Sequence, residues 1–357
     1  MEAMTEKTLD KTALRDFAVN ARKKLKERIE LQANLMGFYE DNRQVNYEFE
    51  DDKFFKINGE TFSKKQAQKL REQITKKSFA NVIDEVAYTW FNRFIALYYM
   101  EVNGYSENNC NIISNLSNIS QYAVSIASLL SDEEKQSIIE NINNSKEEPI
   151  FKTLIIHQCN VMNKKLPFLF EEIDDYTELL FPRGLLNNDS AIREMLAIDK
   201  SNWQVVEIIG WLYQYYIAER KDEVFANLKK GKKISKEDIP AATQIFTPKW
   251  IVKYMVENSV GKMWLEAHPN PELQSKFKYY LESAEQDEEV KQKLKEIINK
   301  NICPEDIKVL DPACGSGHIL VTAFEVLYEI YKSAGYVEDD IASLILTKNL
   351  YGLDICD

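Results

Sequence analysis

A glycine-rich turn near residue 315 constrains the fold of this chain more than any other feature of its sequence. The string Asp311-Pro-Ala-Cys-Gly-Ser-Gly317 follows a short apolar run over 307–310 and precedes an apolar stretch of helical period over 318–331. This order predicts a buried strand, a tight loop and a helix. Gly315 and Gly317 would let a ligand approach the backbone closely, and the helix N-terminus favours an anionic group. The sequence therefore predicts a ligand crevice at the carboxyl end of a strand.

The kind of ligand follows from what this loop contains and lacks. A dinucleotide loop has glycine or alanine at a third position where this chain has Leu320, and no acidic residue ends a strand about 20 residues later. The nucleotide-triphosphate pattern is missing at both Gly231-Lys232 and Gly261-Lys262. Asp311 suits a cationic amino group, and the helix end suits a carboxylate. Together they fit the zwitterionic methionine part of S-adenosylmethionine.

Two further segments fit the same ligand. A second strand is predicted over 349–353, ending in Asp354, whose carboxylate can accept both hydroxyls of a ribose in the adjacent crevice. The helix between the two strands is expected to make one right-handed crossover. Upstream, the string Thr243-Gln-Ile-Phe-Thr-Pro-Lys-Trp250 predicts another helix start, with Thr247 at the N-cap and Pro248 at the first helical position.

In this order, Phe-Thr-Pro, Asp-Pro-x-Cys-Gly-Ser-Gly and Gly-x-Asp resemble the motifs of gamma-class amino-methyltransferases. The resemblance implies that residues around the loop line the methionine end of S-adenosylmethionine, namely Thr247, Asp311, Ala313, Gly315 and Gly317, and that Asp354 holds the ribose. Cys314 is interpreted as part of the loop because no base lies near it in sequence. His318 is interpreted as a first-turn helix residue.

The resemblance extends toward the N-terminus. Several strings are similar to the helical region of the PglX family, the methyltransferases of BREX phage-defence systems: Ala87 to Leu97, Met100 to Tyr105, Leu166 to Phe170, Asp174 to Leu180, Ile209 to Tyr215 and Lys232 to Val252. The family implies N6-adenine methylation of double-stranded host DNA by the full-length protein, together with other BREX proteins. These are expectations from the resemblance.

The rest of the chain reads as mostly helical. Helices are predicted over 8–36, 64–77 and 203–230, the last ended by Gly231, and a densely apolar central helix over 81–100. A two-stranded hairpin is expected within 45–62, around Asn58-Gly59, and short helices over 150–162, 166–170 and 176–181. The predicted fold is a mainly α N-terminal domain, 1–235, followed by the start of a Rossmann-like α/β methyltransferase domain, 236–357, with an outer helix or insertion at 271–301.

Composition limits the kinds of partner. Lys and Arg total 45 against 57 Asp and Glu, so the formal net charge is −12, which argues against a general nucleic-acid coat. The lysine run from Lys229 to Lys236 either contacts phosphates or forms a solvated helix end, and the second interpretation is preferred. The sequence has no membrane-length apolar run or leader-like start, so a cytoplasmic protein is expected. Five scattered cysteines and three histidines predict no metal site.

The catalytic loop of such enzymes, Asn/Asp-Pro-Pro-Tyr/Phe, does not occur in this sequence. The nearest string, Asn270-Pro-Glu-Leu273, is interpreted as a turn. No catalytic residue is therefore predicted, and the chain is expected to be inactive alone, as the front part of a longer or split protein. Two alternatives stay open: a type IIG restriction-modification methylase subunit, although Asp51-Asp-Lys53 is read as a charged turn and not a nuclease motif, and a non-catalytic assembly or docking protein.

Overall fold

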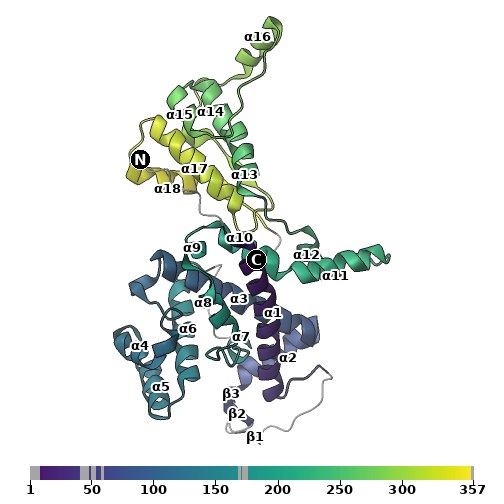
Figure 1. Ribbon diagram of the computed structural model, residues 1–357, viewed down its shortest axis with the longest axis vertical. Coiled ribbons are helices and arrows are strands. Elements are labelled where there is room, and N and C mark those ends of the chain that lie inside the picture. Colours follow the sequence, from purple (N-terminus) through teal and green to yellow (C-terminus); the bar gives the residue numbers. More distant parts are fainter. Residues whose placement is uncertain are drawn as a thin grey trace. The chain divides into compact units, whose positions relative to one another are not determined.

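The computed structural model describes residues 9–40, 48–49, 54–57, 60–167, 170 and 176–354. The chain is mostly helical with little sheet, as the sequence predicts. Its contacts divide it into two compact units, Met1–Asp222 and Glu223–Asp357; both are drawn in Figure 1. The domain boundary expected after residue 235 stays a prediction. The strings at 51–53 and 58–59 and most of 168–175 lie outside the described residues.

The first unit is built around one buried helix. Its α-helices are α1 (Lys11–Leu35), α2 (Lys64–Lys77), α3 (Phe79–Asn103), α4 (Ile119–Ser125), α5 (Asp132–Asn143), α6 (Glu147–Asn163), α7 (Tyr176–Leu179), α8 (Ala191–Ala197), α9 (Lys200–Trp203) and α10 (Glu207–Tyr216). Short 3₁₀ turns, η1 (Glu107–Asn109), η2 (Leu116–Asn118) and η3 (Ala127–Leu129), connect some of them. In α3, Trp90 and Tyr98 are fully buried, which confirms the central helix.

Three short strands accompany this unit. They are β1 (Glu48–Phe49), β2 (Phe54–Ile57) and β3 (Glu60–Ser63), paired antiparallel in the order β1-β2-β3. The sequence predicted two strands here; the structure adds β1 at the edge of β2. Ser63 then caps α2 by accepting a hydrogen bond from the N–H of Gln66, so the strands lead directly into a helix.

Two helix predictions between residues 150 and 230 need correction. The expected single helix over 203–230 is three helices, α9, α10 and α11 (Ala218–Lys229). The first break arises because Gln204 and Val205 donate backbone hydrogen bonds to residues three positions back, which tightens the chain into a 3₁₀ turn. The block over 150–162 belongs to the 17-residue helix α6 and not to a short one.

The second unit carries a parallel strand pair and its covering helices. After η4 (Lys236–Asp238) come α12 (Ile239–Thr243), α13 (Lys249–Val256), the π turn η5 (Glu257–Gly261), α14 (Lys262–Ala267), α15 (Pro271–Lys276) and α16 (Glu288–Ile297). Then follow η6 (Pro304–Asp306), β4 (Val309–Asp311), α17 (His318–Ser333), α18 (Glu338–Lys348) and β5 (Leu350–Gly352). A separate apolar core joins α13, α14, α17 and α18.

The string at 270–273 is the start of a helix and not the predicted turn. The Asn270 side chain accepts a hydrogen bond from the N–H of Leu273 at 3.1 Å, and Pro271 occupies the first position of α15. Proline fits there because the first N–H of a helix has no partner within the helix. Helix α16, by contrast, has no buried residue, in agreement with the outer helix predicted in this region.

A buried amide ties the second unit together. Asn349, which is 0% exposed, donates hydrogen bonds to the carbonyls of Pro304 and Ile307 at 2.7 and 2.8 Å and accepts one from the Tyr331 hydroxyl at 2.9 Å. Its hydrogen bonds therefore connect the start of β5 to the segment before β4 and to α17. Among the helices that the structure describes, none combines the length and apolar character required to cross a lipid bilayer.

Candidate cofactor-binding site

The two strands place their carboxyl ends side by side. β4 and β5 are parallel, with Asp311 opposite Gly352. The pairing continues beyond the strands, because Leu353 N–H donates to the Asp311 carbonyl and Cys314 N–H donates to the Leu353 carbonyl, both at 2.9 Å. The glycine loop after β4 and the residues after β5 thus form one hydrogen-bonded edge.

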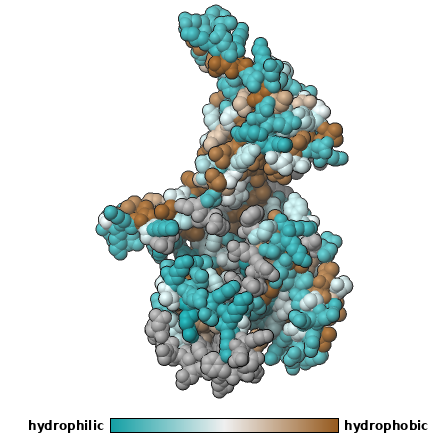
Figure 2. Space-filling view, turned by 180° about the vertical axis from the view of Figure 1, so that it is seen from behind, coloured by the Kyte–Doolittle hydropathy of each residue, from teal (hydrophilic) through white to brown (hydrophobic). Residues whose placement is uncertain are grey.

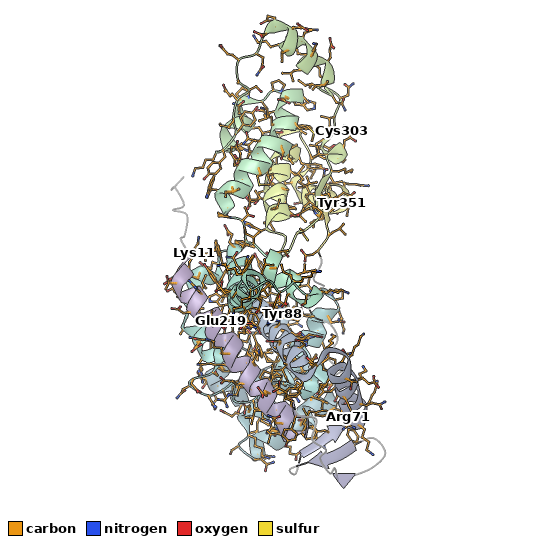
Figure 3. The ribbon with its side chains drawn as sticks, turned by 90° about the vertical axis from the view of Figure 1, so that its right-hand side faces the viewer. Lys11, Arg71, Tyr88, Glu219, Cys303 and Tyr351 are labelled. Carbon is orange, nitrogen blue, oxygen red and sulfur yellow. The ribbon has the colours of Figure 1, made fainter. Side chains whose placement is uncertain are left out.

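One face of this strand pair is exposed, contrary to the buried strand predicted over 307–310. Leu310 and Tyr351 are paired in register and are 60% and 47% exposed, and Figure 3 labels Tyr351 on β5. Val309 and Leu350 pack on the other side, against the core formed with α17 and α18. The described helices therefore cover only one face of the pair.

Asp311 is the buried acidic group of the site. It is 8% exposed, and its Oδ1 accepts a hydrogen bond from Ala313 N–H at 3.1 Å. Its Oδ2 is buried without a hydrogen-bond partner within the described part of the chain. A buried carboxylate oxygen without a donor is costly, so Asp311 has the capacity to accept a hydrogen bond from a cationic ligand.

The two loop glycines adopt backbone conformations that favour glycine. Gly315 and Gly317 have φ of +51° and +78°, and a Cβ added to either would meet nothing within 4 Å. Glycine is therefore favoured at both positions by the positive φ and not by a lack of space for a side chain. The space beside both glycines is open. Gly317 also precedes the first turn of the 16-residue helix α17, whose N–H groups favour an anion.

Asp354, which follows β5, contacts the glycine loop that follows β4. Its Oδ2 accepts a hydrogen bond from Gly315 N–H at 2.6 Å. The structure thus brings Asp354 to the loop, whereas the sequence suggested only a ribose partner for it. The pKa of the Cys314 thiol is raised by burial and by the carboxylates of Asp354 and Asp311, which agrees with its interpretation as a loop residue and not a nucleophile.

Gly352 is a residue of the site that sequence reasoning missed. A Cβ there would lie 3.0 Å from both Cys314 Sγ and Leu320 Cδ1. Glycine at this position lets the loop and the first turns of α17 pack against β5. The string Gly-Leu-Asp was visible in the sequence. The steric reason for glycine at position 352 was not, because Leu320 and Cys314 lie 32 and 38 positions earlier in the chain.

The upstream motif lies against the same helix. The Phe246 ring stacks on His318 with centroids 4.4 Å apart and an interplanar angle of 28°. His318 is the first residue of α17, as predicted. The N-cap prediction is wrong, however: α13 begins at Lys249, its N-cap is Pro248, and Thr247 lies one residue earlier, half-buried, with no capping hydrogen bond. The N–H of Ile251 instead bonds to the Pro248 carbonyl.

The structure links some of the predicted site residues directly by hydrogen bonds and others only through neighbouring residues. Hydrogen bonds link Asp311 to Ala313 and Asp354 to Gly315, and Gly317 belongs to the same turn. Thr247 is linked to the start of α17 through its neighbour Phe246, which stacks on His318. Within the described ranges, no group of three or more His, Cys, Asp or Glu side chains is placed to hold a metal ion.

Comparisons with known proteins define the class. No family model matches the chain. The adenine-specific methyltransferase BrxX of Escherichia coli is 43% identical over 297 residues, which is 81% of this chain and 24% of that protein. The adenine-specific methyltransferase PglX of Lacticaseibacillus casei is 34% identical over 386 aligned residues, 97% of this chain and 31% of that protein.

A third relative is more distant. A putative type II restriction enzyme and methyltransferase of Methanocaldococcus jannaschii is 27% identical over 206 residues, 49% of this chain and 17% of that protein. The class that BrxX and PglX define is the adenine-specific methyltransferases. Within it, this chain belongs to the PglX family, which includes BrxX and PglX, and it spans between 24% and 31% of the length of those two relatives.

Proposed function

We propose that this chain forms the S-adenosylmethionine-binding part of a DNA adenine-N6 methyltransferase. The observation that carries the proposal is the buried Oδ2 of Asp311, which lacks a hydrogen-bond partner among the described residues and belongs to a loop with open space at both glycines. A carboxylate kept in this state is suited to an ammonium group. The helix that begins at His318 is suited to the carboxylate of the same amino acid.

Each predicted residue has a role in this proposal. Asp311 accepts from the methionine amino group, and the backbone at Ala313, Gly315 and Gly317 lies along the methionine. Asp354 accepts from the ribose hydroxyls while holding the loop through Gly315. Thr247 lines the methionine end. When bound, S-adenosylmethionine supplies a methyl group made electrophilic by its sulfonium. The Rossmann-like character of the unit is part of the same proposal.

For the whole protein, the names of the relatives support methylation of adenine. The resemblance to the PglX family supports double-stranded DNA as the substrate and a role in BREX phage defence with other BREX proteins. This chain contains no Asn/Asp-Pro-Pro-Tyr/Phe string, which is the loop that holds a flipped base in the resembled enzymes. We therefore expect it to bind the cofactor without transferring the methyl group.

Calorimetric titration with S-adenosylmethionine tests the proposal. Asp311→Asn retains an acceptor for Ala313 N–H but removes the charge, and should weaken binding at least tenfold, the loss of about 1.5 kcal/mol expected for a charged hydrogen bond. Asp306→Asn is the matched control, because Asp306 is an exposed acid that also accepts a backbone hydrogen bond, from Cys303. A folded parent that does not bind would instead support the docking-protein alternative.

A further inference from the structure

Five lysines in the second unit form a strip of positive charge. They are Lys229, Lys230, Lys232, Lys233 and Lys236, called here the lysine strip, and all are exposed. Among the residues that the structure describes, no ion pair involves the lysine strip. A dense group of cations without carboxylate partners is unexpected on a chain of net charge −12, where acids are abundant.

A solvated helix end does not account for the whole strip. Helix α11 ends at Lys229, and Gly231, with φ +81°, turns the chain, while Lys232 N–H bonds back to the Asn227 carbonyl at 3.1 Å. Cations near the last turn offset the helix dipole, but that effect falls off within the turn. Lys232 and Lys233 lie beyond it, in a segment without regular secondary structure, and Lys236 begins η4. Figure 2 shows hydrophilic side chains at this end of α11, beside apolar ones on the same helix.

The lysine strip is tethered to the candidate cofactor site. Phe246 follows Lys236 by ten positions and stacks on His318 at the start of α17. Ten residues reach at most about 35 Å when fully extended, and η4 and α12 shorten that reach. One helical turn of B-DNA is also about 34 Å. A phosphate bound at Lys236 would therefore lie within roughly one helical turn of Phe246.

We infer that the lysine strip binds the phosphates of double-stranded DNA beside the base that is to be methylated. The inference rests on the proposed function. Exposed lysines act as point charges, which neutralise phosphates without reading sequence. Asp238, two residues after Lys236, accepts a hydrogen bond from the Ser235 hydroxyl at 3.0 Å. The strip positions DNA, and it leaves base recognition to other parts of the protein.

Salt-dependent DNA binding tests this inference. The 357-residue chain is titrated onto a fluorescent duplex at several salt concentrations, and the slope of log K against log salt is measured. The triple variant Lys230→Gln, Lys232→Gln, Lys233→Gln should reduce the steepness of that slope by about 2 to 3, since each lost phosphate contact changes it by about 0.9. The control is Lys291→Gln, Lys293→Gln, Lys295→Gln on α16, which removes equal charge from exposed lysines, two of them paired with Glu288 and Glu289.

The outcomes separate this inference from the proposed function. Equal loss in the two triple variants would mean a net-charge effect and would overturn the inference, as would a parent that does not bind DNA or that binds polyglutamate equally well. Calorimetry with S-adenosylmethionine is run on the same variants. Cofactor binding without strip-dependent DNA binding rejects only the inference that the lysine strip binds DNA. Strip-dependent DNA binding without cofactor binding rejects only the proposed cofactor site.

Discussion

The carboxylate of Asp354 accepts a hydrogen bond from the backbone N–H of Gly315 at 2.6 Å, so the residue after β5 holds the loop after β4. Asp354→Ala should destabilise the second unit by about 1 kcal/mol, because Gly315 N–H loses its charged acceptor. Asp354→Asn keeps an acceptor and should cost less. Urea unfolding measures the difference. Equal losses in the two variants would show that the hydrogen bond does not stabilise the loop.

The Phe246 ring, stacked on His318, is the contact that places the Phe-Thr-Pro segment beside the loop. Phe246→Leu keeps an apolar side chain but loses the stack, worth about 1 kcal/mol. It should weaken S-adenosylmethionine binding about fivefold, measured by calorimetry. Phe225→Leu, at an exposed position of α11, is the control and should have no effect. Unchanged binding in Phe246→Leu would show that the Phe-Thr-Pro segment, and with it Thr247, does not contribute to the cofactor site.

A second substitution should relieve part of the crowding that a side chain at position 352 would cause. Gly352→Ala places a Cβ 3.0 Å from Leu320 Cδ1 and Cys314 Sγ, and should cost about 1 to 3 kcal/mol of unfolding free energy. Leu320→Ala removes one of these contacts. In a double-mutant cycle by urea unfolding, the cost of Gly352→Ala should be smaller in the Leu320→Ala background. Strict additivity would contradict the steric explanation.

The buried amide of Asn349 should be intolerant of substitution. Asn349→Leu leaves two carbonyls and the Tyr331 hydroxyl without their partner, and should destabilise the chain by about 3 kcal/mol or more. Tyr331→Phe removes only one of the three hydrogen bonds and should cost about 1 to 2 kcal/mol. Thermal and urea unfolding rank the two. The reverse order would mean that the Asn349 bonds contribute little.

The chemistry of Cys314 should depend on pH in a defined direction. Its pKa is raised by burial and by Asp354 and Asp311, so less thiolate forms at a given pH and alkylation is slow. Its alkylation rate should keep rising with pH after that of an ordinary thiol, of pKa about 8.5, has levelled off. Mass spectrometry follows both Cys314 and the exposed Cys303 as an internal reference. Asp354→Asn should accelerate labelling at Cys314 alone, and S-adenosylmethionine should protect it.

Much of the local structure is readable from sequence. Helix α2 spans the predicted residues 64–77, and Gly231, with a positive φ, follows the end of α11. The order of strand, glycine loop and helix around residues 311–318 is also found as predicted. These features succeed because their determinants lie within a few residues of each other: a cap, a helical period, or a glycine where φ is positive.

Other features depend on partners far apart in the chain, and only the tertiary structure decided them. Phe246 meets His318 across 72 positions, Gly352 is crowded by Cys314, and Asn349 bonds to carbonyls more than 40 positions earlier. The breaks on either side of α10 and the exposed face of β4 likewise escaped prediction. Sequence patterns report the conformations available to a short segment; which segments pack together is set by burial and hydrogen bonding over the whole unit, and no single segment contains that information.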